Sequence, residues 1–417
     1  MNVATRFFGF AVAVALVAGV GWRVVKVGMA DHLVAGDPHN ALAWNPANPS
    51  ALAAIAKKHL DDGEPAPARD IALTLLQREP ANGDGFVVLS DWARTQGEAA
   101  RTSEWSDIAL RYAPQALAPR AWIANEDFVR GNYAAALDGI DKILRVCPRQ
   151  YEQLFPAMLD FARTPEFADA LATKLISGPT WKSGMVTALL SKATPDAMDR
   201  VLSTMQRQGA LDSATTAQWI DRLAKVGAWG EAYARWVSAT NGAHANRLSN
   251  VFNGGFESAP TNSGFDWRVG DSAGVVIERA AVSGATGSNA MSLTFLGRRS
   301  DSIPLHHWLL LSSGSYRLTF RATAHDLRSD RGVEWVVRCQ QSGKELAASE
   351  RLTGDFQWTS HEVDFEVPDA DCQAQDLFLR NAGANGAGKV IRGSISFDDV
   401  AIGRTDVTNA PRAEPSH

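Results

Sequence analysis

Two kinds of helix-breaking residue recur in the first part of the chain with one shared period of 34 residues. They are four prolines and three glycines: Pro46, Pro80, Pro114 and Pro148, with Gly63, Gly97 and Gly131. Each glycine lies 17 residues before one of the last three prolines. Glycine readily adopts the left-handed conformation that ends a helix, and proline stops the helix that follows. The period therefore predicts helix pairs stacked into a solenoid.

The residues at the turns resemble the tetratricopeptide repeat, whose length is also 34 residues. The clearest unit covers 117–150, where GNYAAAL at 131–137 matches the family's turn and second-helix start. Ala68 and Ala136 occupy the small position where two helices touch, Thr102 takes that place in the middle unit, and GAWGEA at 227–232 repeats the order. The resemblance covers about 46–150, and helices without the period are expected over 150–210.

We expect one right-handed α-solenoid over 31–246, with a protein or peptide partner on its concave face. Large apolar residues at helical spacing usually face the core. The tryptophans expected in this core are Trp92, Trp105, Trp122, Trp219, Trp229 and Trp236.

The chain starts with an apolar run, 7–22, that contains no charged residue. It is slightly short for a bilayer core of about 30 Å, but Arg23 and Lys26 can snorkel, and this extends the span to 7–29. We favour an uncleaved single-pass anchor in 1–30 over a signal peptide cut after Ala30, because positive charges just before a cleavage site are unusual. A buried core helix is the remaining alternative. The flanking charges are nearly balanced, so they do not decide the orientation.

After residue 246 the pattern changes from helical to alternating. Segments 315–322 and 362–367 alternate polar and apolar residues, and 333–339 places Trp335, Val337 and Cys339 on one face, with turn-forming residues between the segments. Such short strands predict an antiparallel β-sandwich over 250–404, followed by a disordered tail at 405–417. The fold class is thus multidomain, α plus β.

The borders of this β-region resemble jelly-roll carbohydrate-binding modules. NGGFE at 253–257 and FDW at 265–267 open it, and FDDVAI at 397–402 closes it. The resemblance implies a sugar on exposed aromatic and polar side chains of one sheet. The candidates are Trp308, Trp358, Glu334 and Arg338, whereas Trp267 and Trp335 are assigned to the core. The alternative is that the four candidates only pack an edge or a loop, since alternation reports a face and not a site.

The same resemblance implies a structural calcium that joins the first and last strands. Glu257 and Asp398 occupy the matching positions. Calcium takes six to eight oxygen ligands, and the sequence offers at most two or three.

Two of the three cysteines, Cys339 and Cys372, fall in the β-region. We favour a disulfide between them over two reduced thiols, because the apolar N-terminal run makes export independently plausible. Cys147 would then be the odd free thiol. Since disulfides form in oxidising compartments, the body is expected in the periplasm, anchored to the bacterial inner membrane.

The sequence gives little support for nucleic-acid binding, nucleotide binding or catalysis. The formal net charge of −5 gives no basic footprint for nucleic acid. GANGAGK at 383–389 matches a phosphate loop by pattern, but Val390 stands where Ser or Thr must hold magnesium. No constellation gathers a nucleophile, a base and an orienting group, so no enzyme is expected.

The architecture looks like accessory proteins of bacterial polysaccharide synthesis and export. We expect a non-catalytic envelope scaffold whose solenoid binds a protein and whose β-sandwich contacts a glycan. One alternative is a purely protein-binding scaffold with a structural sandwich. A second is a glycan-acting enzyme with carboxylates at the interface of the two domains.

Overall fold

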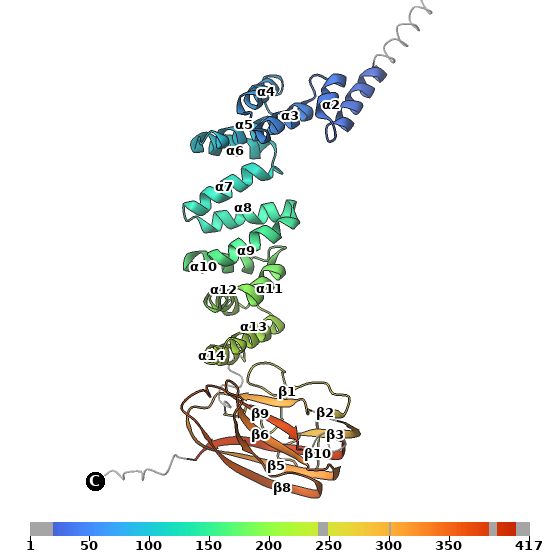
Figure 1. The fold of residues 1–417 in the computed structure, drawn as a ribbon, viewed down its shortest axis with the longest axis vertical. Coiled ribbons are helices and arrows are strands. Elements are labelled where there is room, and N and C mark those ends of the chain that lie inside the picture. The colour runs from blue at the N-terminus through green and yellow to red at the C-terminus, as the bar shows by residue number, and fades with distance from the viewer. Residues whose placement is uncertain (1–19, 241–248, 300–301, 383–389, 406–417) are drawn as a thin grey trace, which may run out of the picture. The chain divides into compact units, whose positions relative to one another are not determined.

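The computed structural model describes residues 20–240, 249–299, 302–382 and 390–405. Its helices precede its strands along the chain (Figure 1). The chain divides into two compact units, Met1–Leu189 and Leu190–His417, which are described separately. A helical N-terminal part and a C-terminal antiparallel β-sandwich are both confirmed.

Residues 20–33 are helical. The helices that follow are α2 (Pro38–Trp44), α3 (Pro49–Asp61), α4 (Pro65–Arg78), α5 (Gly83–Thr95), α6 (Ala99–Tyr112), α7 (Leu117–Val129), α8 (Tyr133–Val146), η1 (Pro148–Gln150), α9 (Tyr151–Phe161), α10 (Pro165–Ile176), α11 (Lys182–Lys192), α12 (Pro195–Arg207), α13 (Ser213–Lys225) and α14 (Trp229–Ala239).

The period seen in the sequence is the spacing of the helix starts. Helices α3, α5 and α7 begin one full period apart, as do their partners α4, α6 and α8. The turn glycines Gly63, Gly97 and Gly131 all have φ between +73° and +79°. The small positions Ala68 and Ala136 are fully buried. The predicted helix pairs are therefore confirmed over 46–150, and each helix from α3 to α8 packs on the next.

The expected loss of period after residue 150 needs a small correction. Helix α9 still begins one full period after α7, and only α10 begins slightly early relative to α8. The starts of α13 and α14 are as far apart as the two helix starts within each of the three regular pairs. Gly227 between them again has a positive φ, +83°. The pair arrangement thus returns at the end of the helical region.

The predicted membrane anchor is only partly covered by the structure. Its residues 7–19 lie outside the described residues. Among the residues that are described, no helix combines the length and the apolar character needed to cross a bilayer.

In the part of the chain that the structure describes, the β-sandwich consists of two five-stranded sheets. Its strands are β1 (Arg268–Val269), β2 (Val275–Ala280), β3 (Ala290–Arg299), β4 (Leu305–Leu309), β5 (Gly314–Arg328), β6 (Val333–Cys339), β7 (Glu345–Ala348), β8 (Gly354–Val367), β9 (Gln375–Asn381) and β10 (Val390–Arg404). We call the sheet with the order β1-β4-β9-β6-β7 the β9 sheet, and the sheet with the order β2-β3-β10-β5-β8 the β10 sheet. The paired strands run antiparallel.

The sandwich core holds large rings from both sheets. Trp335 from β6 packs on Phe397 from β10, with 5.1 Å between ring centroids, and on Trp267, at 5.6 Å. Trp267, Trp335 and Phe397 are all fully buried. The expected core positions of Trp267 and Trp335 are therefore confirmed.

Candidate functional site

The last helix pair, α13–α14, and the sandwich share an aromatic cluster. Trp229, Tyr233 and Trp236 of α14 meet Phe252, Phe265 and Trp308 of the sandwich, with centroid distances of 5.2 Å for Trp229–Trp308, 5.0 Å for Tyr233–Phe265 and 5.1 Å for Trp236–Phe252. We call these six residues the junction cluster. Because it buries apolar rings from both sides, the last helices belong to the same compact unit as the strands.

Gly264 shows how closely the loop that enters the sandwich approaches α14. Its φ is +56°, and a Cβ at this position would clash with the indole of Trp236. Only glycine satisfies both conditions.

The junction cluster changes the interpretation of Trp308, which the sequence predicts as an exposed sugar-binding ring. The Arg268 guanidinium lies over this indole at 3.8 Å, and Arg268 also pairs with Asp221 of α13 at 2.6 Å. Trp229 lies nearly perpendicular to the same ring, at an interplanar angle of 87°. Trp308 does point away from the sandwich core, but strand alternation could not show that a helix pair covers part of that face.

The outer face of the β9 sheet carries two other predicted residues, Arg338 and Glu334. In the strand register Trp308 lies opposite Asp376, and Asp376 lies opposite Arg338. The side chain of Arg338 is 43% exposed, contacts Asp376 at 3.1 Å and lies over the ring of Phe378 at 4.6 Å. The Phe378 ring therefore lies beside an exposed charged donor, Arg338, whose partner Asp376 is itself buried and also contacts His306 at 3.1 Å.

Glu334 lies on the same outer face but is only 4% exposed, which corrects its prediction as an open ligand. Arg380 donates to its Oε1 at 2.6 Å, and Arg351 contacts its Oε2 at 3.4 Å. These two arginines cover the carboxylate and satisfy its charge. Both arginines are partly exposed, and Arg380 also pairs with Glu345 at 2.7 Å.

Trp358 lies on the opposite side of the sandwich. It belongs to β8 in the β10 sheet, with its Nε1 donating to the Ser283 carbonyl at 2.8 Å and Arg321 over its ring at 5.1 Å. Its strand face is polar, as the sequence predicts, but this face belongs to the other sheet. The four candidate residues therefore do not form one site.

The two predicted calcium ligands, Glu257 and Asp398, both contact the loop before β3. Glu257 accepts hydrogen bonds from the amides of Ser288 and Asn289, at 2.8 and 3.0 Å, which lowers its pKa. Asp398 accepts from the amide of Thr286 at 2.6 Å, although burial raises its pKa. Among the described residues no group of three or more His, Cys, Asp and Glu side chains could hold a metal ion. Both carboxylates thus accept hydrogen bonds from backbone amides of one loop, and the calcium site stays a prediction to which we assign no role.

The two cysteines of the β-region are joined by a disulfide, Cys339–Cys372, with a Cα–Cα distance of 5.0 Å. Both residues are buried in the sandwich core. Cys147 in the helical part is free and half-buried.

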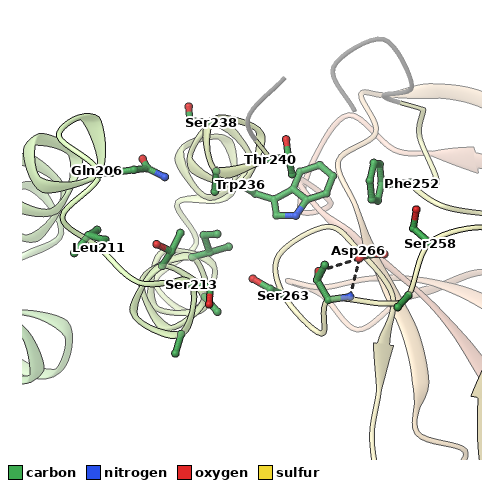
Figure 2. Close-up of a pocket in the computed structure, with 18 residues that line it drawn as sticks. Gln206, Leu211, Ser213, Trp236, Ser238, Thr240, Phe252, Ser258, Ser263 and Asp266 are labelled. Atoms are coloured by element: carbon green, nitrogen blue, oxygen red, sulfur yellow. Dashed lines mark hydrogen bonds between the residues drawn. The ribbon is translucent and has the colours of Figure 1, made fainter. Parts of the chain in front are cut away.

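A pocket of about 740 Å³ opens beside the junction cluster, between α12–α14 and the loop at 252–266 (Figure 2). Trp236 and Phe252 lie at its wall, and much of the remaining lining consists of Ser and Thr side chains. Asp266 is the one ionisable residue among the described residues that line it. Its carboxylate accepts hydrogen bonds from Thr261 and from the Trp267 amide, while burial raises its pKa. The lining therefore offers hydroxyl groups, without the pair of carboxylates that most glycoside hydrolases use.

Sequence reasoning missed three residues of these surfaces: Phe378, Arg380 and Arg268. A signal for the first two was present, because Asp376, Phe378 and Arg380 alternate with the buried Leu377 and Leu379. Arg268 carried no signal, because its partners Asp221 and Trp308 come from distant parts of the sequence.

Comparison with known proteins finds partial likenesses. No protein-family model matches the chain, and no curated protein matches it. Among solved structures, "CBM4 structure and function" is 15% identical, covering 37% of this chain and 99% of that chain with a TM-score of 0.28. The "Family 16 Carbohydrate Binding Module-2" is 14% identical over 37% and 100% of the two chains, again with a TM-score of 0.28. A thermophilic TPR protein of Thermus thermophilus is 22% identical over 45% and 96%, with a TM-score of 0.24. At these values we draw no conclusion about function from the likeness.

Proposed function

We propose that the protein is a non-catalytic scaffold that binds a glycan on the outer face of the β9 sheet and a protein on its helical repeats. The observation that carries the glycan part is the Phe378 ring beside the Arg338–Asp376 pair, next to Arg380 over Glu334. The apolar C–H face of a sugar ring suits an aromatic face. Each sugar hydroxyl both donates and accepts, so the half-exposed guanidinium of Arg338 can donate to it, while the buried Asp376 positions that guanidinium through their ion pair.

The protein part of the proposal depends on the helix pairs of the first unit. Arrays of stacked helix pairs present extended concave surfaces, and such surfaces commonly bind proteins or peptides. The regular spacing of the helix starts from α3 to α8 supports this assignment.

We place this scaffold in bacterial polysaccharide assembly or export, held at the inner membrane through residues 7–29 with its body in the periplasm. The Cys339–Cys372 disulfide supports an oxidising compartment, because disulfides rarely persist in the cytosol. The polysaccharide role itself comes from the architecture that the sequence resembles. Thiol labelling of the exported protein without reductant tests the compartment, and labelling of Cys339 or Cys372 would contradict it.

A glycan array followed by affinity gels tests the binding face. We expect Phe378→Ala and Arg338→Ala to weaken retention of a bound polysaccharide by about ten-fold, since each removes one contact of about 1–2 kcal/mol. Trp358→Ala is the matched control, because it removes a half-buried aromatic ring from the opposite sheet. Equal losses for all three variants would contradict the assignment of the face.

An array on which no acidic or neutral glycan binds would instead leave a purely protein-binding scaffold with a structural sandwich. The glycan-acting enzyme is tested on the same samples, by measuring new reducing ends after incubation with the bound polysaccharide. We expect none, and their appearance would contradict the non-catalytic proposal.

A further inference from the structure

A second cleft, of about 480 Å³, lies at the other side of the junction cluster, where α13 ends and α14 begins. Its lining combines Lys225 and Trp229 of the helix pair with Arg268, Trp308, Gln340 and Gln341 of the sandwich. The volume falls in the range of about 300–1,000 Å³ that is usual for small-ligand sites. We call it the junction cleft.

The charges of the junction cleft do not balance among the described residues that line it. Arg268 is neutralised by Asp221 at 2.6 Å. Lys225 is exposed and adds a second cation, so the described lining carries two cations and one carboxylate. The Nε of Arg268 is buried, and no described group accepts a hydrogen bond from it. A buried donor without an acceptor is costly, so Asp221 only partly satisfies the Arg268 guanidinium.

The other lining groups suit a sugar ring. Trp229 and Trp308 meet edge to face at 5.2 Å, and the indole of Trp308 also lines the cleft. The amides of Gln340 and Gln341 offer donors and acceptors to hydroxyl groups. The strand register joins the cleft to the outer face of the β9 sheet, because Trp308, Asp376 and Arg338 lie side by side across β4, β9 and β6.

We propose that the junction cleft binds the carboxylate-bearing unit of an acidic saccharide, with Lys225 pairing with the carboxylate and Gln340 with the ring hydroxyls. This inference rests on the proposed glycan binding. It adds that the ligand is anionic and that the last helix pair supplies part of the site. A lysine at the cleft selects for the negative charge, whereas the amide contacts do not depend on it.

Calorimetric titration of the full chain with trigalacturonic acid and with its methyl ester tests the proposal, because the two probes share the ring and differ in charge. We expect the acid to bind at least about ten-fold more tightly than the ester, which is the effect of one charge-assisted contact. Lys225→Gln should remove this preference, whereas Gln340→Ala should weaken the acid and the ester alike. Lys142→Gln on α8 is the matched control, since it changes the net charge equally and lies in the other unit.

Equal binding of acid and ester, or a Lys225→Gln protein that keeps the preference, overturns the junction cleft while glycan binding still stands. If neither probe binds but neutral glycans bind on the array, the junction cleft is likewise overturned and glycan binding still stands. Failure of every glycan removes the proposed function as well. Binding of a short polyglutamate peptide as tightly as the acid would show a general anion site and also overturn the saccharide assignment.

Discussion

At the scale of single residues, His307 on β4 connects the sandwich to the segment around Phe252, which precedes the first strand. It is 1% exposed, lies against the Trp267 ring, and its Nε2 accepts a hydrogen bond from the Phe252 amide at 3.1 Å. Burial lowers the pKa of this imidazole to about 4. The ring is therefore neutral in the folded protein at neutral pH.

The free energy of unfolding is expected to fall as the pH decreases from about 6.5 to about 4. In this window the unfolded chain protonates His307 near its ordinary pKa of about 6.5, whereas the folded protein does not, so protons favour unfolding. The slope from this group reaches about 1.4 kcal/mol per pH unit. Urea unfolding at several pH values measures it, with His307→Gln as the variant that keeps an acceptor for Phe252.

Comparing the wild type with His307→Gln separates the effect of His307 from that of carboxylates whose pKa shifts stabilise the fold as the pH falls. Burial raises the pKa of Asp266 and of Asp398, so each stabilises the fold slightly as the pH falls. These terms are common to both proteins. Identical pH dependence of the wild type and His307→Gln would contradict the prediction.

The sequence correctly predicted on which face of its strand a residue lies. It did not predict which distant side chains cover that residue. Alternation placed Trp335 in the core and Trp358 on a polar strand face, and both agree with the structure. It could not show that two arginines lie over Glu334 or that a helix pair meets Trp308. Those contacts join residues from distant parts of the chain.

At the scale of elements, the disulfide connects β6 with the loop before β9. It closes a loop between cysteines whose sequence separation is 33. Cross-linking removes conformational freedom from the unfolded chain, and for a loop of this length the gain is about 3–4 kcal/mol.

We expect the double variant Cys339→Ala/Cys372→Ala to lose about 3 kcal/mol of unfolding free energy in the sandwich. Denaturant unfolding with and without reductant measures it, and reductant should reproduce the loss in the wild type. Cys147→Ala is the control, with a change below about 1 kcal/mol, because that thiol is half-buried and free. A reductant-insensitive wild type would contradict the prediction.

The elements themselves were largely predictable because their signals are local. Gly63, Gly97 and Gly131 each follow a helix with a positive φ, which is a local preference of glycine. Alternation over 315–322 and 362–367 predicts the strands β5 and β8. The pairing of β9 between β4 and β6 was not predictable. It depends on which distant strand completes the sheet, and single-strand patterns do not carry that information.

At the scale of the whole molecule, the compact units divide at Leu189, well before the change from helix to strand. The reason is the junction cluster, whose rings join α14 to the sandwich. The sequence marked Trp229 and Trp236 as buried, and they are 7% and 4% exposed. It assigned them to contacts between helices, because helical spacing shows that a residue is buried but not which surface buries it.

Trp236→Ala should loosen the last helices and the sandwich loop together. Removing a buried tryptophan costs about 3–5 kcal/mol, and here the lost contacts lie on both sides of the junction cluster. Hydrogen exchange should therefore quicken in α13, α14 and residues 252–267 in parallel. Trp358→Ala, a half-buried ring on the β10 sheet, should leave these segments unchanged. Faster exchange confined to α14 would contradict the coupling.

The junction cluster also has a consequence for self-association. A stack of helix pairs ends in an apolar surface onto which another pair, or another copy, could add, so such arrays need a terminal cap. Here the aromatic side of α14 is already occupied by Phe252, Phe265 and Trp308. The sandwich thus acts as the terminal cap of the last helix pair, and it makes end-to-end polymerisation of the repeats through this surface unfavourable.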